Sequence, residues 1–253
     1  MRLATYPSLK EKVVMVTGGA SGIGEEIVRA FAVQGSRVGF LDIDARRGAA
    51  LQSELRDGGN AANFFPCDLK DADALKDAVE NLSKTLGPVA VLVNNAANDD
   101  RHDWTDVTPA YFDERIATNL RHFFFAIQAV APGMIAAGHG SVVNLGSNSW
   151  WEAVGGMPIY TTAKAAVHGL TRSFARDLGR YRIRVNTVVP GWVMTERQKQ
   201  LWATPEAIKH HLQKQCLPDT VRPVHIARMV LFLASDDAAM CTGNNYMVEG
   251  GSI

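Results

Sequence analysis

Thr17-Gly18-Gly19-Ala20-Ser21-Gly22-Ile23-Gly24 is the stretch that decides the fold, because it joins a short apolar run to a helical pattern. The apolar run is residues 13–16, and Ile23, Ile27 and Phe31 then recur at helical spacing. Glycines at such a junction let the backbone turn tightly and approach a pyrophosphate, which the free N–H groups of a helix N-terminus stabilise. The stretch predicts a strand, a phosphate-binding turn and a helix, although a glycine-rich turn alone is equally compatible with no ligand.

Further runs of strand length follow, and helical patterns separate them. The seven expected strands are residues 13–16, 37–41, 63–65, 89–93, 141–145, 184–189 and 246–248. Strands that alternate with helices form a parallel sheet that is covered on both faces. We therefore expect an α/β fold: a single Rossmann-type doubly wound domain over residues 1–253, with a seven-stranded parallel sheet and helices on both faces.

Residues 190–223 contain no apolar run of strand length. Thr204 followed by Pro205 is a typical helix start, so residues 204–215 are expected to form a helix. We expect residues 190–223 to be an insertion that covers the substrate.

The composition argues against several classes of partner. The 253 residues contain 26 Lys and Arg and 26 Asp and Glu, so the formal net charge is zero, without the basic excess that nucleic acid or anionic membranes attract. No apolar run approaches the length of about 18 residues that a membrane span needs. Cys67, Cys216 and Cys241 form no Cys-x-x-Cys pair, which indicates neither a disulfide framework nor a metal site. We expect a cytoplasmic protein that binds neither nucleic acid, nor membrane, nor metal.

Asp42 bears on the choice of cofactor, because it ends the second expected strand 24 residues after Gly18. A carboxylate at a separation of about 20 residues meets the ribose hydroxyls of a dinucleotide. The same charge repels a 2′-phosphate, so NAD is favoured over NADP. Arg46 and Arg47 lie close by and weaken that preference.

Other strand ends are expected to reach the same crevice. Asp68 and Leu69 follow the third strand, and Asn95 and Ala96 follow the fourth. Asp68 by itself is equally compatible with a helix N-cap.

A second group of residues has the chemistry of proton transfer. Tyr160 and Lys164 are four residues apart in a helical pattern, so their side chains share one face. An ammonium beside a phenol favours the phenolate and lowers its pKa toward neutrality, which suits a general base. Ser147 follows the fifth strand, where its hydroxyl can bond the substrate oxygen or cap a turn. Asn119, in the preceding long helix, is a candidate to hold a relay water.

The motifs together resemble the short-chain dehydrogenase/reductase family over essentially the full length. The matching features, in order, are the turn at residues 17–24, Asn94-Asn95-Ala96, Asn119, Ser147, Tyr160-x-x-x-Lys164, and Pro190-Gly191 with Thr195. The resemblance implies that Tyr160 is the acid/base, that Lys164 binds the nicotinamide ribose, that Ser147 orients the substrate and that Asn119 holds the relay water. Ala97 and Gly146 depart from the family pattern without removing a reacting group.

The same resemblance completes the expected cofactor site, since it places Gly191, Val193 and Thr195 at the nicotinamide carboxamide. The predicted catalytic residues are Asn119, Ser147, Tyr160 and Lys164. The predicted NAD-binding residues are Gly18, Ser21, Gly22, Ile23, Gly24, Asp42, Asp68, Leu69, Asn95, Ala96, Tyr160, Lys164, Pro190, Gly191, Val193 and Thr195.

A narrower resemblance, to bacterial NAD-dependent D-xylose and related aldose 1-dehydrogenases, rests on residues 98–102, 113–116, 119–122, 146–150 and 235–238. It implies oxidation of an unphosphorylated sugar, such as a pentose or 6-deoxyhexose, at C1 to the lactone. The expected substrate site mixes hydrogen-bonding groups and flat apolar faces, as polyols require. Its predicted residues are Asn98, Asp99, Asn148, Trp150, Trp151, Trp192, Arg197 and Gln198, although any one tryptophan is equally compatible with packing alone.

Two other functions stay open from the residues alone. One is the oxidation of a sugar acid such as a 2-keto-3-deoxy-aldonate, whose carboxylate Arg101 or Arg197 would clamp unless acidic neighbours pair with them. The other is a non-catalytic NAD-binding regulator, against which the intact set of Asn119, Ser147, Tyr160 and Lys164 argues.

Phe123, Phe124 and Phe125 span more of a helix than one sheet-facing stripe can bury. The family resemblance implies a dimer interface at this helix and the next, and a homotetramer as the assembly.

Overall fold

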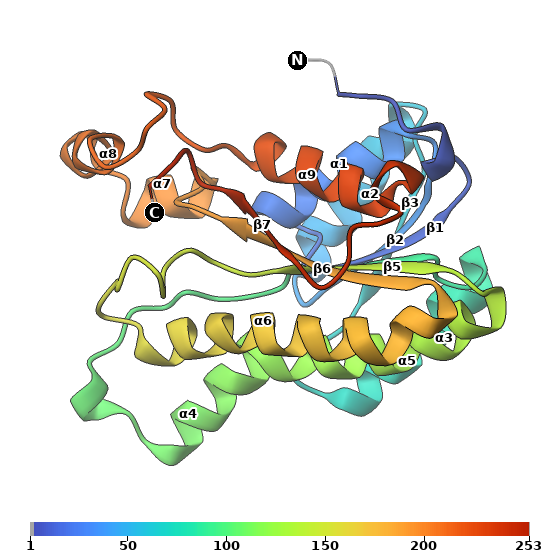
Figure 1. Cartoon of the computed structure of the whole chain (residues 1–253), viewed down its shortest axis with the longest axis horizontal. Helices are drawn as coiled ribbons and strands as arrows, with labels where there is room; N and C mark the ends of the chain where they lie inside the picture. The colour runs from blue at the N-terminus through green and yellow to red at the C-terminus, as the bar shows by residue number, and fades with distance from the viewer. Residues whose placement is uncertain (1–2, 253) are drawn as a thin grey trace.

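A computed structural model, which describes residues 3–252, has a sheet of seven parallel strands (Figure 1). The strands lie in the order β3-β2-β1-β4-β5-β6-β7. Their bounds are β1 (Val13–Thr17), β2 (Arg37–Asp42), β3 (Ala62–Pro66), β4 (Val91–Asn94), β5 (Gly140–Leu145), β6 (Ile183–Pro190) and β7 (Asn245–Val248). All seven expected strands are present, and the predicted fold class is confirmed.

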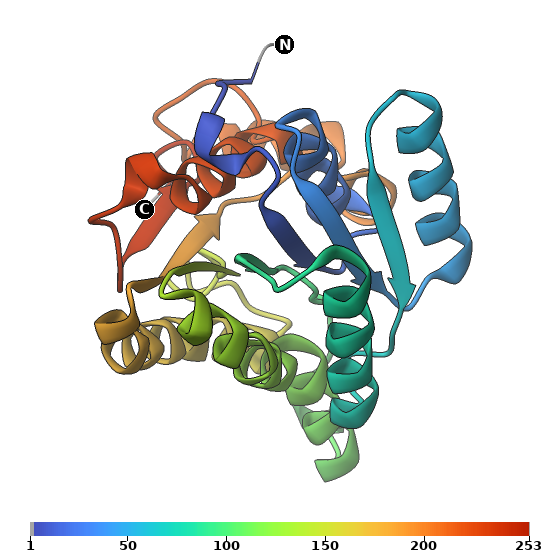
Figure 2. The ribbon, with the colours of Figure 1, turned by 90° about the vertical axis from the view of Figure 1, so that its right-hand side faces the viewer.

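Helices cover both faces of this sheet (Figure 2). One layer holds α1 (Gly22–Val33), α2 (Ala45–Asp57) and α9 (Pro223–Ala234), and the other holds α3 (Ala72–Leu86), α5 (His122–Ala137) and α6 (Pro158–Leu178). Each layer buries its own apolar cluster, with Phe31 and Ile226 in the first and Leu82 and Ile127 in the second. The sheet is thus apolar on both sides, as a parallel sheet requires.

The carboxyl ends of parallel strands meet at one edge, where three shorter helices gather: α4 (Pro109–Ile116), α7 (Glu196–Leu201) and α8 (Pro205–Leu212). The Thr204 hydroxyl accepts from the backbone N–H of Ala207 at 3.1 Å, so the predicted start of α8 is confirmed. The helix ends three residues before the expected position, and α7 was not predicted.

A continuous helical stretch, Pro109–Ala137, joins α4 to α5 through a π-helical turn at Ala117–Arg121. By length and composition alone this stretch could cross a membrane. In the fold, Phe123, Ile127 and Met134 are buried in the core of the domain, so the stretch packs as a core helix.

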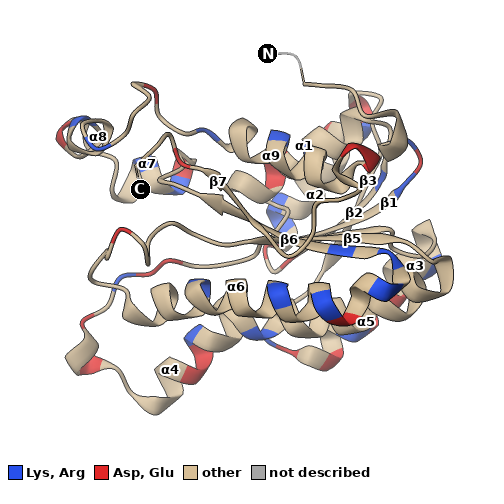
Figure 3. Cartoon of the chain, in the orientation of Figure 1, with Lys and Arg blue, Asp and Glu red and all other residues tan. Residues whose placement is uncertain are grey.

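Lys and Arg as well as Asp and Glu are spread over the elements seen in Figure 3, and neither sign of charge is confined to one side of that view.

Candidate active site

A cavity of about 1000 Å³ opens at the carboxyl edge of the sheet. Every predicted NAD-binding residue lines it, as do Ser147, Tyr160 and Lys164. Of the predicted substrate residues, Asn98, Asp99, Asn148, Trp192, Arg197 and Gln198 line it as well. The cavity lies at the upper end of the range of about 300–1,000 Å³ for small-molecule sites, which suits a dinucleotide and a substrate together.

The glycine-rich turn is shaped to admit a phosphate. Gly18 has φ +66°, and a Cβ on it would lie 2.7 Å from the Ala96 Cα; a Cβ on Gly24 would lie 1.9 Å from the Gly18 carbonyl oxygen. The Asn95 amide donates to the Thr17 and Gly18 carbonyls at 3.0 Å each, which fixes the turn against β4. No side chain caps α1, so free N–H groups at its start lie beside the cavity. These residues fit a dinucleotide pyrophosphate.

Asp42 is already hydrogen-bonded on both oxygens. Its Oδ2 accepts from the Ala20 N–H at 2.9 Å and its Oδ1 from the Asp44 N–H at 3.0 Å, while the residue lines the cavity. Of the two nearby arginines, Arg47 lines the cavity and Arg46 does not.

The N-cap alternative for Asp68 is wrong. Asp71 caps α3, since its carboxylate accepts from the N–H groups of Asp73 and Ala74 at 3.0 Å each. Asp68 instead faces the cavity and accepts from the Lys70 N–H at 3.0 Å.

Tyr160 and Lys164 share one face of α6, as predicted. The Lys164 Nζ lies 5.8 Å from the centre of the Tyr160 ring and donates to the Leu145 carbonyl at 2.8 Å. Lys164 is buried, and burial lowers its pKa to about 7. Burial also raises the pKa of Tyr160; the Asp99 charge adds to the rise, and a hydrogen bond from Ser147 opposes it.

The expected lowering of the Tyr160 pKa by Lys164 is therefore absent from this structure. Taking the phenol out of water disfavours the phenolate, and the same burial weakens the ammonium that was expected to oppose it.

The Ser147 hydroxyl contacts both the reacting phenol and its own loop. It bonds the Ser149 hydroxyl at 2.9 Å and accepts from the Ser149 N–H at 3.1 Å, while it lines the cavity beside Tyr160. The two interpretations of Ser147, a turn cap and a substrate-facing hydroxyl, are thus compatible.

Asn119 lies in the π-helical turn and does not line the cavity. Its Oδ1 accepts from the Asn98 N–H at 2.8 Å, and its Nδ2 donates to the Arg115 carbonyl at 3.0 Å. Its side chain therefore positions Asn98, and the role of Asn119 in holding a relay water stays a prediction.

His122, next to this turn, was not singled out from the sequence. Its Nε2 lies 3.1 Å from the Ala96 carbonyl oxygen and 3.0 Å from that of Thr118. Two acceptors around one nitrogen mean that Nε2 carries the proton. Burial lowers the pKa of His122 to about 3, so a neutral imidazole ties Ala96 to the helix.

Trp192 begins a hydrogen-bonded chain at the substrate end. Its Nε1 donates to the Gln198 Oε1 at 2.8 Å, and the Gln198 Nε2 donates to the Asp99 Oδ2 at 2.8 Å. The chain fixes α7 to the loop after β4 and presents an aromatic face and a carboxylate to the cavity.

Trp150 and Trp151 do not line the cavity. Their rings stack on one another at 3.8 Å, and both contact His168 edge to face. Both rings thus pack on one another and on α6, so the predicted place of Trp150 and Trp151 on the wall of the substrate site is corrected.

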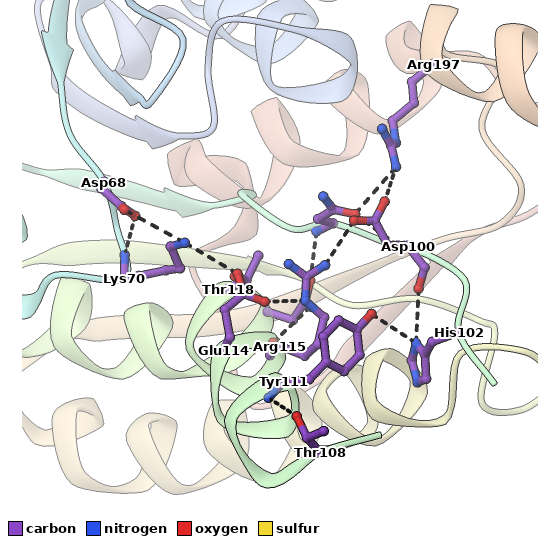
Figure 4. A network of polar contacts seen from close by, with 12 residues as sticks. Asp68, Lys70, Asp100, His102, Thr108, Tyr111, Glu114, Arg115, Thr118 and Arg197 are labelled. Carbon is purple, nitrogen blue, oxygen red and sulfur yellow. Dashed lines mark hydrogen bonds and ion pairs between the residues drawn. The ribbon is translucent and has the colours of Figure 1, made fainter. Parts of the chain in front are cut away.

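Charged residues form a network across the mouth of the cavity (Figure 4). Lys70 lies 3.4 Å from Glu114, which pairs with Arg115, and Arg115 reaches Asp100 at 3.2 Å. Arg197 on α7 pairs with the same Asp100. Apart from Glu114 and Arg115, which are adjacent, these partners lie 15 to 97 residues apart in the sequence, so their pairing depends on the fold.

Comparison with known proteins agrees with this architecture. A family model described as "Enoyl-(Acyl carrier protein) reductase" matches residues 18–252. The chain belongs to the short-chain dehydrogenase/reductase family, as predicted.

Individual relatives match over nearly the whole length. The chain is 49% identical to D-xylose 1-dehydrogenase of Caulobacter vibrioides over 251 residues, covering 99% of each chain. It is 44% identical to "Probable galactose dehydrogenase GalD" of Rhizobium meliloti, covering 97% of this chain and 96% of the relative. The solved structure of a 7α-hydroxysteroid dehydrogenase with NADH and 7-oxo glycochenodeoxycholic acid superimposes with a TM-score of 0.92 at 32% identity, covering 98% and 97%.

Proposed function

We propose that this protein is an NAD-dependent dehydrogenase that oxidises the C1 hydroxyl of a neutral aldose to the lactone. The observation that carries the proposal is the chain Trp192–Gln198–Asp99, which sets a flat ring and oriented polar groups beside Tyr160. A sugar needs both, because its hydroxyls require partners and its C–H face packs on an aromatic ring. The names of the relatives at 49% and 44% identity support a sugar as the substrate.

Each reacting group has a stated part in this reaction. Tyr160 takes the proton of the C1 hydroxyl, Ser147 donates a hydrogen bond to the same oxygen, and Lys164 holds its place through the Leu145 carbonyl. A bound NAD would supply the acceptor for the hydride that leaves C1. We propose that Asp42, beside the glycine-rich turn, selects NAD by repelling a 2′-phosphate.

The sugar-acid alternative now depends on Arg101. Arg197 is held by Asp100 and lies 3.6 Å from Asp99, so its charge is compensated. Arg101 lines the cavity and lies over the Trp202 ring at 5.4 Å, and it forms no ion pair with a carboxylate of residues 3–252. It is thus the residue that would clamp a substrate carboxylate.

The test is NADH formation from a panel of D-xylose, D-galactose, 6-deoxyhexoses and the corresponding acids. We expect the wild-type protein to turn over neutral sugars, and we expect the Arg101→Ala variant to retain that activity. Turnover of the acids alone, lost in Arg101→Ala, would replace the aldose proposal with the sugar-acid one.

We also propose a cytoplasmic homotetramer. Phe123 is buried in the core, whereas Phe124 on the same helix is 44% exposed and contacts Phe174 of α6. On α6, a Cβ added to Gly169 would meet nothing within 4 Å, so this face is open to close helix packing. Light scattering should give four times the chain mass, and a monomer at assay concentration would contradict the assembly.

A further inference from the structure

The segment that follows β7, residues 249–252, lies behind the wall of the cavity and contacts three other segments there. The Gly250 carbonyl accepts from the N–H groups of Cys216 and Leu217 at 3.0 and 2.9 Å, which attaches the segment to the loop after α8. Gly250 and Gly251 have φ +78° and +80°, which favour glycine. A Cβ on Gly191, which follows β6, would lie 2.7 Å from the Glu249 Cβ, so these backbones are in close contact.

Ser252 completes the connection to the substrate loop. Its hydroxyl lies 2.6 Å from the Glu152 Oε1, 2.8 Å from the Glu249 Oε2 and 3.1 Å from the Asn148 Nδ2. The Asn148 amide also donates to the Glu152 Oε1 at 2.6 Å. Asn148 and Glu152 line the cavity, whereas Ser252 does not.

The Ser252 hydroxyl therefore separates two carboxylates. Glu249 is buried and also accepts from the Ser252 N–H. Glu152 accepts hydrogen bonds from Asn148 and Ser252. Of the two glutamates, Glu152 lines the cavity and Glu249 does not. Without the hydroxyl, the Glu152 carboxylate on the cavity wall loses one of its two hydrogen-bond donors and keeps the Asn148 amide, so the side chain is held less firmly.

We propose that Ser252 is a positioning residue for substrate binding: it holds Asn148 and Glu152 in the orientation in which they meet the sugar hydroxyls. This inference rests on the proposed function, because it assigns the role of Asn148 and Glu152 to a hydroxylated substrate. It extends the substrate site to a segment about 100 residues away in the sequence.

The test compares Ser252→Ala with Ser252→Thr, which keeps the hydroxyl, and with Ser53→Ala, which removes an exposed hydroxyl on α2. We expect Ser252→Ala to raise the KM for the sugar about tenfold, as the loss of a hydrogen bond to a charged group does. The kcat and the KM for NAD should stay within about twofold of wild type, because Tyr160, Ser147 and the glycine-rich turn are untouched. Ser252→Thr should restore the KM.

A merely structural role would instead lower kcat through a smaller active fraction and leave the sugar KM unchanged, which would overturn the proposal. Backbone hydrogen exchange in residues 147–153 provides a readout that needs no substrate. We expect faster exchange there in Ser252→Ala than in Ser53→Ala. Equal exchange would contradict the inference even if sugars are turned over, whereas a wild-type enzyme inactive on every sugar would contradict the proposed function alone.

Discussion

Replacing Asp42 by Asn tests how the chain selects between the two nicotinamide dinucleotides. The carboxylate accepts from the Ala20 and Asp44 N–H groups, and it lies on the cavity wall beside the turn that contains Gly18. Asn keeps nearly the same shape and one acceptor oxygen, while it removes the charge and one of the two accepted hydrogen bonds. The NADP/NAD ratio isolates the charge effect, because the lost hydrogen bond affects both cofactors alike.

The expected magnitude follows from Coulomb's law. Two unit charges 4 Å apart interact by about 1 kcal/mol in water, and a phosphate monoester carries nearly two charges at neutral pH. The Asp42 carboxylate should then disfavour NADP by about 2 kcal/mol, or about 30-fold. Arg47 lines the same cavity, with its Nε 3.6 Å from the Asp44 carboxylate.

The assay measures kcat/KM for NAD and for NADP at a fixed, saturating sugar concentration. We expect the NADP/NAD ratio to rise about 30-fold in Asp42→Asn. Asp57→Asn, which removes the same charge at the far end of α2, should leave the ratio unchanged. A ratio within about twofold of wild type in Asp42→Asn would refute the electrostatic account of cofactor choice.

Three further predictions concern the reacting phenol, the glycine-rich turn and a buried imidazole. Tyr160→Phe should lower turnover by about a thousandfold, the range of general acid–base catalysis, while calorimetry shows unchanged NAD affinity; residual turnover near wild type would remove Tyr160 from its role. Gly24→Ala should weaken NAD binding more than tenfold, because its Cβ would lie 1.9 Å from the Gly18 carbonyl oxygen, whereas Gly133→Ala, 3.7 Å from the Pro88 Cβ, should bind NAD normally. His122, with its pKa lowered to about 3, is neutral in the folded protein and gains a proton on unfolding below pH about 6.5. The free energy of unfolding should therefore fall by about 2 kcal/mol between pH 6.5 and pH 5, as measured by denaturant melts. An equally steep fall in His122→Gln would contradict this assignment.

The cofactor end could be predicted from the sequence because it follows from the topology of a parallel sheet. Gly18, Asp42, Asn95 and Pro190 come directly after or at the ends of four strands, and parallel strands bring such ends to one edge. A one-residue error in a strand boundary does not move a residue away from that edge. The prediction therefore tolerated the small shifts in strand bounds that the structure shows.

The substrate end could be predicted only in part, because its residues lie in loops. Only Ser149 separates Trp150 and Trp151 from Asn148, yet they do not line the cavity as Asn148 does, since loop side chains have no fixed period. Arg197 lies at the cavity, but its pairing with Asp100 depends on how α7 meets the loop after β4. No sequence pattern indicated a role for Ser252, because its hydrogen-bond partners Asn148 and Glu152 lie about 100 residues earlier in the sequence.

Tyr160 and Lys164 show a different limit, because their shared helix face was predicted correctly and the direction of the Tyr160 pKa shift was not. The spacing of Tyr160 and Lys164 predicts a shared helix face, and the attraction between their charges then predicts a lowered phenol pKa. That argument counts the charge and omits the loss of water around both groups. Burial raises the Tyr160 pKa and lowers the Lys164 pKa to about 7, so the nearby Lys164 does not by itself lower the pKa of the phenol. Proton removal by Tyr160 should therefore depend on what else the cavity contains, and turnover of Lys164→Met should fall even where sugar and cofactor still bind.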